Sequence, residues 1–278
     1  MKNYIYYLFL ILLFASCGIG ESDNSYRENP KGGRVYGGTL HVNESYQYLS
    51  LYPYKITDAV SHNIANQIYE GLVRFDRRNI TEVQPSIASR WEIDATGTQY
   101  TFYLKKDVFF HDDPCFPNGK GREVKAQDFK YSFQLLCTKS DDNPLFESTF
   151  KGKVKGADAF YSGEKSSLDG VIVIDDYTLQ INLITPTNSF LYILAGEGGT
   201  VLAQEAVKKY GRNITVGTGP FIFKGKNSLD QLVLVSNPVY HRTDSLGNKL
   251  PFIDSLVFNF IVDKKEELEA FKRGDIHI

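Results

Sequence analysis

The sequence has few of the residues that most often carry catalysis or metal binding. Its 278 residues include three cysteines, one tryptophan and five histidines, and each histidine stands alone. No Gly-x-Ser-x-Gly or His-Glu-x-x-His pattern is present, and no Ser/His/Asp set occurs in a recognisable frame. These absences argue against a hydrolase. Because no catalytic motif includes a histidine, we expect each of the five to be a surface residue or a core residue with its hydrogen bonds satisfied. The five are His41, His62, His111, His241 and His277.

The sequence also has no excess of charge of either sign. It contains 31 basic and 33 acidic side chains, which argues against a nucleic-acid partner because such a partner requires clustered basic residues. Hydrophobic residues make up 42% of the chain, enough for a folded core. The 18 tyrosines suit a wet binding cleft, since tyrosine is amphipathic, but a tyrosine-rich β protein would have the same composition.

Only the N-terminus carries a long apolar run, from residue 4 to 15, after Lys2. The run is shorter than the roughly 20 residues that span a bilayer as a helix. It fits a secretory signal, and Leu13–Cys17 resembles a bacterial lipobox, which implies cleavage before Cys17 and lipid on its sulfur. An uncleaved anchor and a plain signal peptide are the alternatives. All three export the domain, and residues 18–34 are interpreted as a flexible tether.

Two cysteines then remain outside the reducing cytosol, Cys115 and Cys137. Their spacing matches no zinc motif, because no second pair accompanies them. A disulfide between the two is conceivable, and the sequence leaves open whether it forms.

Hydrophobic periodicity predicts helices and strands at particular places. Apolar residues four apart, from Ile64 through Ile68 to Leu72, predict one face of a helix that ends at Gly71. Alternation over residues 100–104 predicts a half-buried strand.

Two further elements follow from the same patterns. The apolar stripe of Phe129, Phe133 and Leu136 predicts the buried face of a helix. Residues 171–174 and 178–183 predict a hairpin around two adjacent aspartates. The residues expected on its inner face are Leu179, Ile181 and Leu183.

Several segments together resemble one protein family. The order "IYEGLVRFD" (68–76), "PSIASRWEI" (85–93) and "YTFYLKKDVFFHD" (100–112) resembles the family 5 extracellular solute-binding proteins of ABC transporters, of the dipeptide- and oligopeptide-binding type. The turn "GTGPF" (217–221) and the segment "LEAFKRGDIHI" (268–278) resemble further family motifs in the same order.

The resemblance implies a mixed α/β (α+β) fold, the first lobe of a class II periplasmic-binding-protein-like architecture. Lobe I would comprise residues 35–70 and about 168–278, and an inserted subdomain would comprise about 71–167. Family members continue into a second lobe, which this sequence lacks, so the resemblance implies an incomplete domain. Such proteins close two lobes on a ligand.

The resemblance also implies ligand-contacting residues. One is a loop before the predicted helix, where Asp58 equally suits a helix N-cap. Another is the 217–220 turn, whose glycines and proline suggest unusual backbone dihedrals; a simple turn is the alternative. The residues implied are Thr57, Asp58, Ala59, Val60, Phe146, Gly217, Thr218, Gly219 and Pro220. The sequence around His111, Asp112 and Asp113 favours turn chemistry over metal binding.

The function that the resemblance implies is capture of peptides for an ABC importer by a lipoprotein in the cell envelope, on the periplasmic or outer surface. Its partners would be a peptide or other small solute, the ABC permease subunits, and the membrane through the Cys17 anchor. No cofactor, catalysis or nucleic acid is implied. A structural envelope lipoprotein or non-functional remnant, and an exported hydrolase, are the competing hypotheses.

Overall fold

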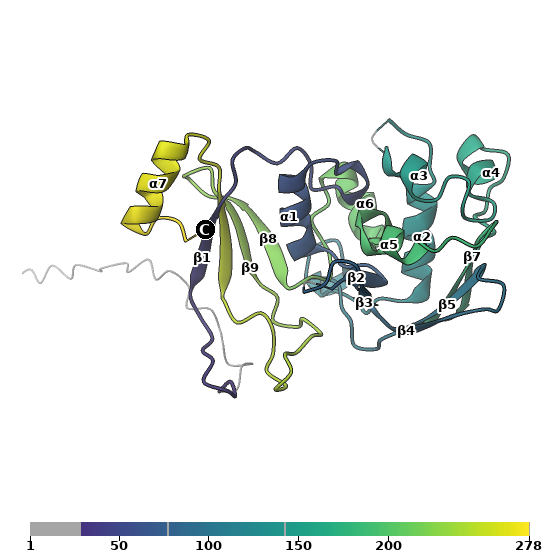
Figure 1. Ribbon diagram of the computed structural model, residues 1–278, viewed down its shortest axis with the longest axis horizontal. Coiled ribbons are helices and arrows are strands. Elements are labelled where there is room, and N and C mark those ends of the chain that lie inside the picture. The colour runs from purple at the N-terminus through teal and green to yellow at the C-terminus, as the bar shows by residue number, and fades with distance from the viewer. Residues whose placement is uncertain (1–28, 77, 142, 278) are drawn as a thin grey trace, which may run out of the picture.

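The computed structural model describes residues 29–76, 78–141 and 143–277, and two four-stranded sheets dominate it (Figure 1). The first sheet has the order β1-β10-β9-β8, with β1 parallel to β10 and the other pairs antiparallel. The second has the order β4-β5-β7-β6 and is antiparallel throughout. A short ribbon pairs β2 with β3. The strands are β1 Thr39–Asn43, β2 Val73–Phe75, β3 Val83–Pro85, β4 Ala88–Ile93, β5 Gln99–Leu104, β6 Val171–Asp175, β7 Thr178–Asn182, β8 Phe221–Lys226, β9 Leu232–Ser236 and β10 Ser255–Asn259.

Helices connect and cover these sheets. Figure 1 shows α1 between the two sheets, α2 to α6 beside the second sheet, and α7 at the outer end of the first. None of these described helices is long and apolar enough to cross a bilayer. The α-helices are α1 Ala59–Ile68, α2 Ala126–Leu136, α3 Leu145–Ser148, α4 Ala157–Ser162, α5 Phe190–Ala195, α6 Gln204–Tyr210 and α7 Lys264–Arg273. The 3-10 helices are η1 Pro53–Lys55, η2 Pro117–Gly119, η3 Glu197–Gly199 and η4 Gly211–Asn213.

The local periodicities give the right elements. Strand β5 alternates half-buried and buried residues along its length, as predicted. The β6–β7 hairpin forms, and Leu179, Ile181 and Leu183 are fully buried. In α2, Phe129 and Phe133 are buried in the core, which confirms the predicted apolar stripe.

Helix α1 is shorter than predicted. It ends at Ile68, and Tyr69 is extended, so Leu72 lies outside the helix. The carbonyl of Ile68 accepts a hydrogen bond of 2.9 Å from the Gly219 backbone N–H, and Gly71 forms a bridge with Thr200. Tertiary pairing therefore takes over the backbone groups that would have continued the helix.

The two sheets divide the chain at a different place from the expected lobe boundary near residue 168. The β6–β7 hairpin follows this boundary, yet β7 pairs with β5 in the second sheet. The chain returns to the first sheet only at β8, which begins at Phe221. Inner-face residues such as Leu179 pair with Phe102 of β5, so burial against that strand sets where the hairpin belongs.

The two cysteines within the described residues are free, so the conceivable disulfide is not formed. The backbone N–H of Cys115 donates to Asp113, whose carboxylate also accepts from the Tyr210 hydroxyl of α6. Cys137 caps the end of α2 and is fully buried, which raises the pKa of its thiol. These contacts hold Cys115 against α6 and Cys137 in the core.

Candidate functional site

Two adjoining pockets of about 510 and 500 Å³ open beside the β2–β3 ribbon. Both volumes lie in the range typical of small-molecule sites. We call the two together the groove. Residues from three parts of the chain line both pockets: Arg74, Asp76, Pro220, Tyr240 and Arg242.

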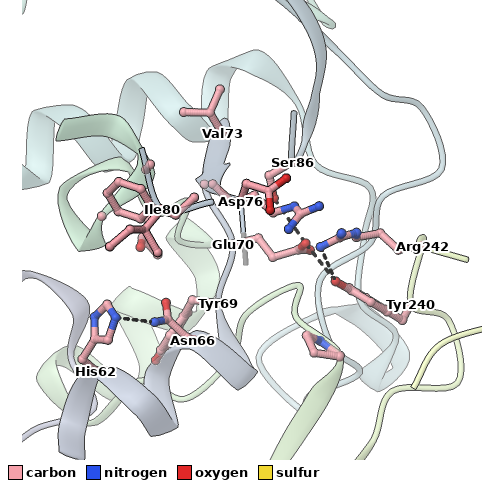
Figure 2. A pocket seen from close by; sticks show the side chains of 17 residues that line it. His62, Asn66, Tyr69, Glu70, Val73, Asp76, Ile80, Ser86, Tyr240 and Arg242 are labelled. Atoms are coloured by element: carbon pink, nitrogen blue, oxygen red, sulfur yellow. Dashed lines mark hydrogen bonds between the residues drawn. The ribbon is translucent and has the colours of Figure 1, made fainter. Parts of the chain in front are cut away.

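The first pocket contains one acid that is buried rather than exposed. The Glu70 side chain is 6% exposed, and its Oε2 pairs with Nε2 of His241 at 2.9 Å. The Thr218 hydroxyl donates to the same oxygen at 3.2 Å, and the Tyr240 hydroxyl donates to Oε1 at 3.2 Å. Ser86 adds a longer contact of 3.4 Å. Figure 2 shows Glu70, Tyr240 and Arg242 converging on one wall of the pocket.

These donors keep the Glu70 carboxylate ionised. Burial alone would raise its pKa, but the hydrogen bond and charge of His241 lower it, and the Arg242 charge and the Thr218 hydroxyl add to that effect. The net result is a pKa below the usual value. The buried Glu70 carboxylate therefore has its hydrogen-bond partners within the protein.

The Gly217–Pro220 loop positions one side of this site. Neither Gly217 nor Gly219 has a positive φ, so the expectation of unusual dihedrals at the glycines is wrong. Their role is close approach: a Cβ on Gly217 would lie 2.0 Å from the Ile68 carbonyl oxygen at the end of α1. A Cβ on Gly219 would lie 2.6 Å from the carbonyl oxygen of Gln67. The loop thus lies against the chain's own backbone.

His111 holds the same loop from its other side. Its ring Nε2 contacts the Gly219 carbonyl oxygen at 2.9 Å, and its backbone N–H donates to the Gly217 carbonyl at 2.8 Å. Burial lowers the pKa of His111 to about 4, outweighing the opposite effects of the Gly219 hydrogen bond and of Glu70. The ring is neutral at pH 7 and carries its hydrogen on Nε2, since it faces a carbonyl.

The structure favours turn chemistry around His111. Asp112 accepts from Lys120 and the Gly121 backbone N–H, while Asp113 accepts from Cys115 and Tyr210. Across the residues that the structure describes, no group of three or more His, Cys, Asp and Glu could hold a metal ion.

Acidification is expected to destabilise the fold through His111. In the unfolded chain a histidine binds a proton near pH 6.5, whereas folded His111 stays neutral down to about 4. The unfolded state therefore binds more protons in this window, so stability is complete above pH 6.5 and is lost as pH falls toward 4. Between about pH 7 and pH 5 this histidine should cost about 2 kcal/mol.

Urea unfolding at both pH values measures this loss, with His111→Gln as the matched variant. Glutamine keeps an N–H that can reach the Gly219 carbonyl but does not titrate. The variant should show about 2 kcal/mol less pH dependence than the wild type. Equal slopes in the two proteins would contradict the assignment.

The Thr57–Val60 segment lies at the start of α1 and lines neither pocket. Asp58 caps the helix, accepting from the Ser61 N–H at 2.8 Å, so its capping role is confirmed. Val60 is 2% exposed and packs in the core, whereas Thr57 and Ala59 are exposed.

Of the other residues predicted to contact a ligand, some are buried in the core and one lines the groove. Phe146 is 1% exposed, stacks on Tyr161 with ring centroids 4.1 Å apart, and lines neither pocket. Gly217, Thr218 and Gly219 are buried, and of the turn only Pro220 lines the groove. Cys17, the expected lipid-bearing residue, lies outside the described residues.

Sequence reasoning missed the residues that make the groove polar. In the sequence, Glu70 and Arg74 stand out only as members of the 68–76 motif, and His241, which stands alone, is predicted to be a surface or satisfied core residue. A signal existed in the segment Ile68–Val73, because a carboxylate flanked by apolar residues must find partners when it is buried. The sequence did not identify those partners, since His241 lies 171 residues away.

Comparisons with known proteins agree with this architecture. The family model "Bacterial extracellular solute-binding proteins, family 5 Middle" matches residues 82–278. The periplasmic oligopeptide-binding protein OppA of Escherichia coli K12 is 27% identical over 244 residues, covering 86% of this chain and 42% of that protein. The dipeptide-binding protein of the same strain is 31% identical over 222 residues, covering 76% of this chain and 38% of that protein.

A solved structure is similar as well. The periplasmic binding protein DppA of Helicobacter pylori, in complex with the peptide STSA, has a TM-score of 0.73 at 25% identity. The match covers 87% of this chain and 46% of that chain. The present chain thus spans less than half the length of these relatives.

Proposed function

The chain belongs to the bacterial extracellular solute-binding proteins of family 5, and from that premise we propose that it captures peptides for an ABC importer. The observation that carries the proposal is the match to proteins named as oligopeptide- and dipeptide-binding, together with a similar structure solved with a peptide. Capture requires no bond to be made or broken, in keeping with a family that binds solutes.

The peptide would lie along one exposed face of α1 and reach into the groove. Ala59, His62 and Asn66 are spaced three and four apart, so they share a helix face, and His62 and Asn66 line the first pocket (Figure 2). Exposed Thr57 extends this face at the start of the helix. From the glycine-rich turn, Pro220 would contact the peptide, since it lines the first pocket.

An extended peptide is best held through its backbone groups, because these are the same whatever its side chains are. The α1 face offers amide and imidazole groups for such contacts. The Asn66 side-chain amide already contacts His62 Nε2 at 2.7 Å, which orients both groups toward the pocket. Such a site would tolerate many side chains.

The remaining parts of the proposal concern location and partners. We place the protein in the cell envelope, held on the membrane by lipid on Cys17, where it would deliver peptide to ABC permease subunits. The lipobox resemblance of Leu13–Cys17 supports the anchor. Mass spectrometry of protein extracted from membranes tests it: a diacylglyceryl cysteine at the mature N-terminus supports the anchor, and an unmodified Cys17 contradicts it.

Calorimetric titration of the purified chain with a mixture of dipeptides to pentapeptides tests peptide capture. We expect a saturable heat with a dissociation constant between about 10 µM and 1 mM. The binding should be this weak because one lobe makes only part of the contact surface. Free amino acids serve as the control and should give no saturable heat. Cleavage of the peptides would instead support a hydrolase. Absence of any heat would contradict peptide capture and favour a structural envelope protein.

A further inference from the structure

One wall of the groove is made by a loop that contains no helix or strand. Residues 240–252, which we call the wall loop, lie between β9 and β10. Five of them line the second pocket: Tyr240, Arg242, Leu250, Pro251 and Phe252. Loops open locally more readily than paired strands do, so the position of these lining residues depends on what packs against the wall loop.

The segment that precedes β1 packs against this loop. We call residues 31–37 the strap. The Asn248 side-chain amide bonds both backbone groups of Lys31: its Oδ1 accepts from the Lys31 N–H at 2.7 Å, and its Nδ2 donates to the Lys31 carbonyl at 3.2 Å. At the other end, the Gly37 N–H donates to the Phe252 carbonyl at 2.9 Å. The strap is therefore bonded to the wall loop at both of its ends.

Tyr36 supports the wall loop from outside the groove. Its ring stacks on Phe252, with ring centroids 5.2 Å apart and an angle of 29° between the planes. Its hydroxyl donates to the Lys249 carbonyl at 2.9 Å. Phe252 lines the second pocket, whereas Tyr36 lines neither pocket. Tyr36 thus backs a residue of the groove wall and would not itself touch a ligand.

Arg34 adds two contacts beside this stack. Its guanidinium carbon lies 5.3 Å from the centroid of the Phe252 ring, and its Nε lies 3.4 Å from Oδ2 of Asp244. The other oxygen of Asp244 accepts from the backbone N–H groups of Leu246 and Asn248, each at 2.9 Å, so this carboxylate organises the tip of the wall loop. Because the Arg34 side chain is half exposed, water screens the ion pair, and we expect the ring stack to hold the loop more strongly.

We propose that the strap positions the ligand site: Tyr36, acting through Phe252, keeps the wall loop in the place where it lines the groove. The inference rests on the proposed peptide capture for its purpose. Its physical content, a loop held from outside by an earlier segment of the chain, requires no ligand and can be tested without one. Tyr36 is accordingly a positioning residue.

Hydrogen–deuterium exchange of the full chain with Tyr36→Ala, measured by mass spectrometry, tests the strap. We expect amides of residues 240–252 to exchange about ten-fold faster, because the stacked ring and the hydroxyl bond are both lost. Exchange in the β4-β5-β7-β6 sheet should not change. Tyr36→Phe keeps the ring and loses only the hydroxyl, so it should retain most of the protection of the wall loop.

Tyr46→Ala is the matched control. Tyr46 is 48% exposed, follows β1 at the end away from the strap, and lines neither pocket. This variant should leave exchange in residues 240–252 as it is in the wild type. Unchanged exchange of the wall loop in Tyr36→Ala overturns the inference. Equal acceleration in both four-stranded sheets also overturns it, because Tyr36 would then support only the stability of the whole fold.

Repeating the exchange with a mixture of dipeptides to pentapeptides separates the strap from peptide capture. A peptide in the groove should slow exchange of the wall loop in the wild type and restore much of its protection in Tyr36→Ala. Exchange is the readout of choice, because a rare opening can become ten-fold more frequent before affinity falls measurably. Acceleration in Tyr36→Ala without any peptide effect supports the strap and contradicts capture in the groove. A peptide effect in the wild type without acceleration in Tyr36→Ala leaves capture standing and overturns the strap.

Discussion

Replacing Gly217 by alanine is expected to remove most of the stability of the fold. The new Cβ would lie 2.0 Å from the Ile68 carbonyl oxygen and 2.8 Å from its carbon, both backbone atoms of α1 that cannot rotate away. Either the loop or the helix end must move, which breaks the Gly219 N–H to Ile68 hydrogen bond. We expect a loss of more than about 3 kcal/mol in the free energy of unfolding, measured by urea denaturation.

Gly196→Ala is the matched control for this substitution. Gly196 has a φ of −90°, and the nearest atom to an added Cβ is the Ile193 carbonyl oxygen at 3.7 Å, an ordinary contact. It should change the unfolding free energy by less than about 1 kcal/mol. If both alanine variants unfold at the same urea concentration, the close approach at Gly217 does not limit the fold.

Removing His241 is expected to have the second largest effect. His241→Ala would leave the Glu70 carboxylate buried without its strongest partner. Leaving a buried carboxylate without its main partner costs about 3 kcal/mol, and the remaining donors Tyr240 and Thr218 keep the expected value at this lower end. Adding Glu70→Gln to the variant should restore part of the loss, because the uncompensated charge is then removed.

The pair of His62 and Glu197 provides the control. The same two residue types meet there, but their side chains are 44% and 18% exposed. Water screens this pair, so His62→Ala should cost less than about 1 kcal/mol. A comparable loss in the two histidine variants would mean that burial of Glu70 does not set the cost.

The pH dependence of the two proteins gives a further check on Glu70. Its folded pKa is lowered, so its contribution is complete above the unfolded value near 4.3 and is lost as pH falls through the folded pKa. The difference in stability between wild type and His241→Ala should therefore shrink below about pH 4. A difference that stays constant down to acid unfolding would contradict an ionised Glu70.

Patterns within one segment predicted the elements that depend on local periodicity. Strand β5, the β6–β7 hairpin and the apolar face of α2 each follow from side chains only a few residues apart. The family resemblance predicted the fold class and the solute-binding family, because several motifs occur in one order. Local periodicity and the order of motifs can both be read from the sequence without knowing which distant residues come into contact.

Features set by long-range contacts were not accessible in this way. The end of α1 depends on a hydrogen bond from the backbone N–H of Gly219, which lies 151 residues after Ile68. The position of the β6–β7 hairpin depends on the pairing of β7 with β5. The family resemblance implies a ligand contact at Phe146, whereas burial of its ring against Tyr161 depends on contacts that the sequence does not show. An aromatic residue in sequence does not reveal which of these two surroundings it will have.

The groove shows the same limit. Its shared wall comes from the β2–β3 ribbon, the Gly217–Pro220 loop and residues 240–242, which only the fold brings together. The sequence supplied the loop through its turn residues but gave no reason to join Arg74 to Arg242. Charges that act together in space are thus scattered in sequence.

Mapping the peptide by NMR tests the central claim most directly. In the isotope-labelled chain, addition of Ala-Glu-Ala should shift the backbone amide signals of His62 and Asn66 on α1 and of Arg74, Asp76 and Arg242 in the groove. Signals from the β4-β5-β7-β6 sheet should stay in place. Shifts confined to that sheet, or no shifts at saturating peptide, would contradict a ligand site along α1 and the groove.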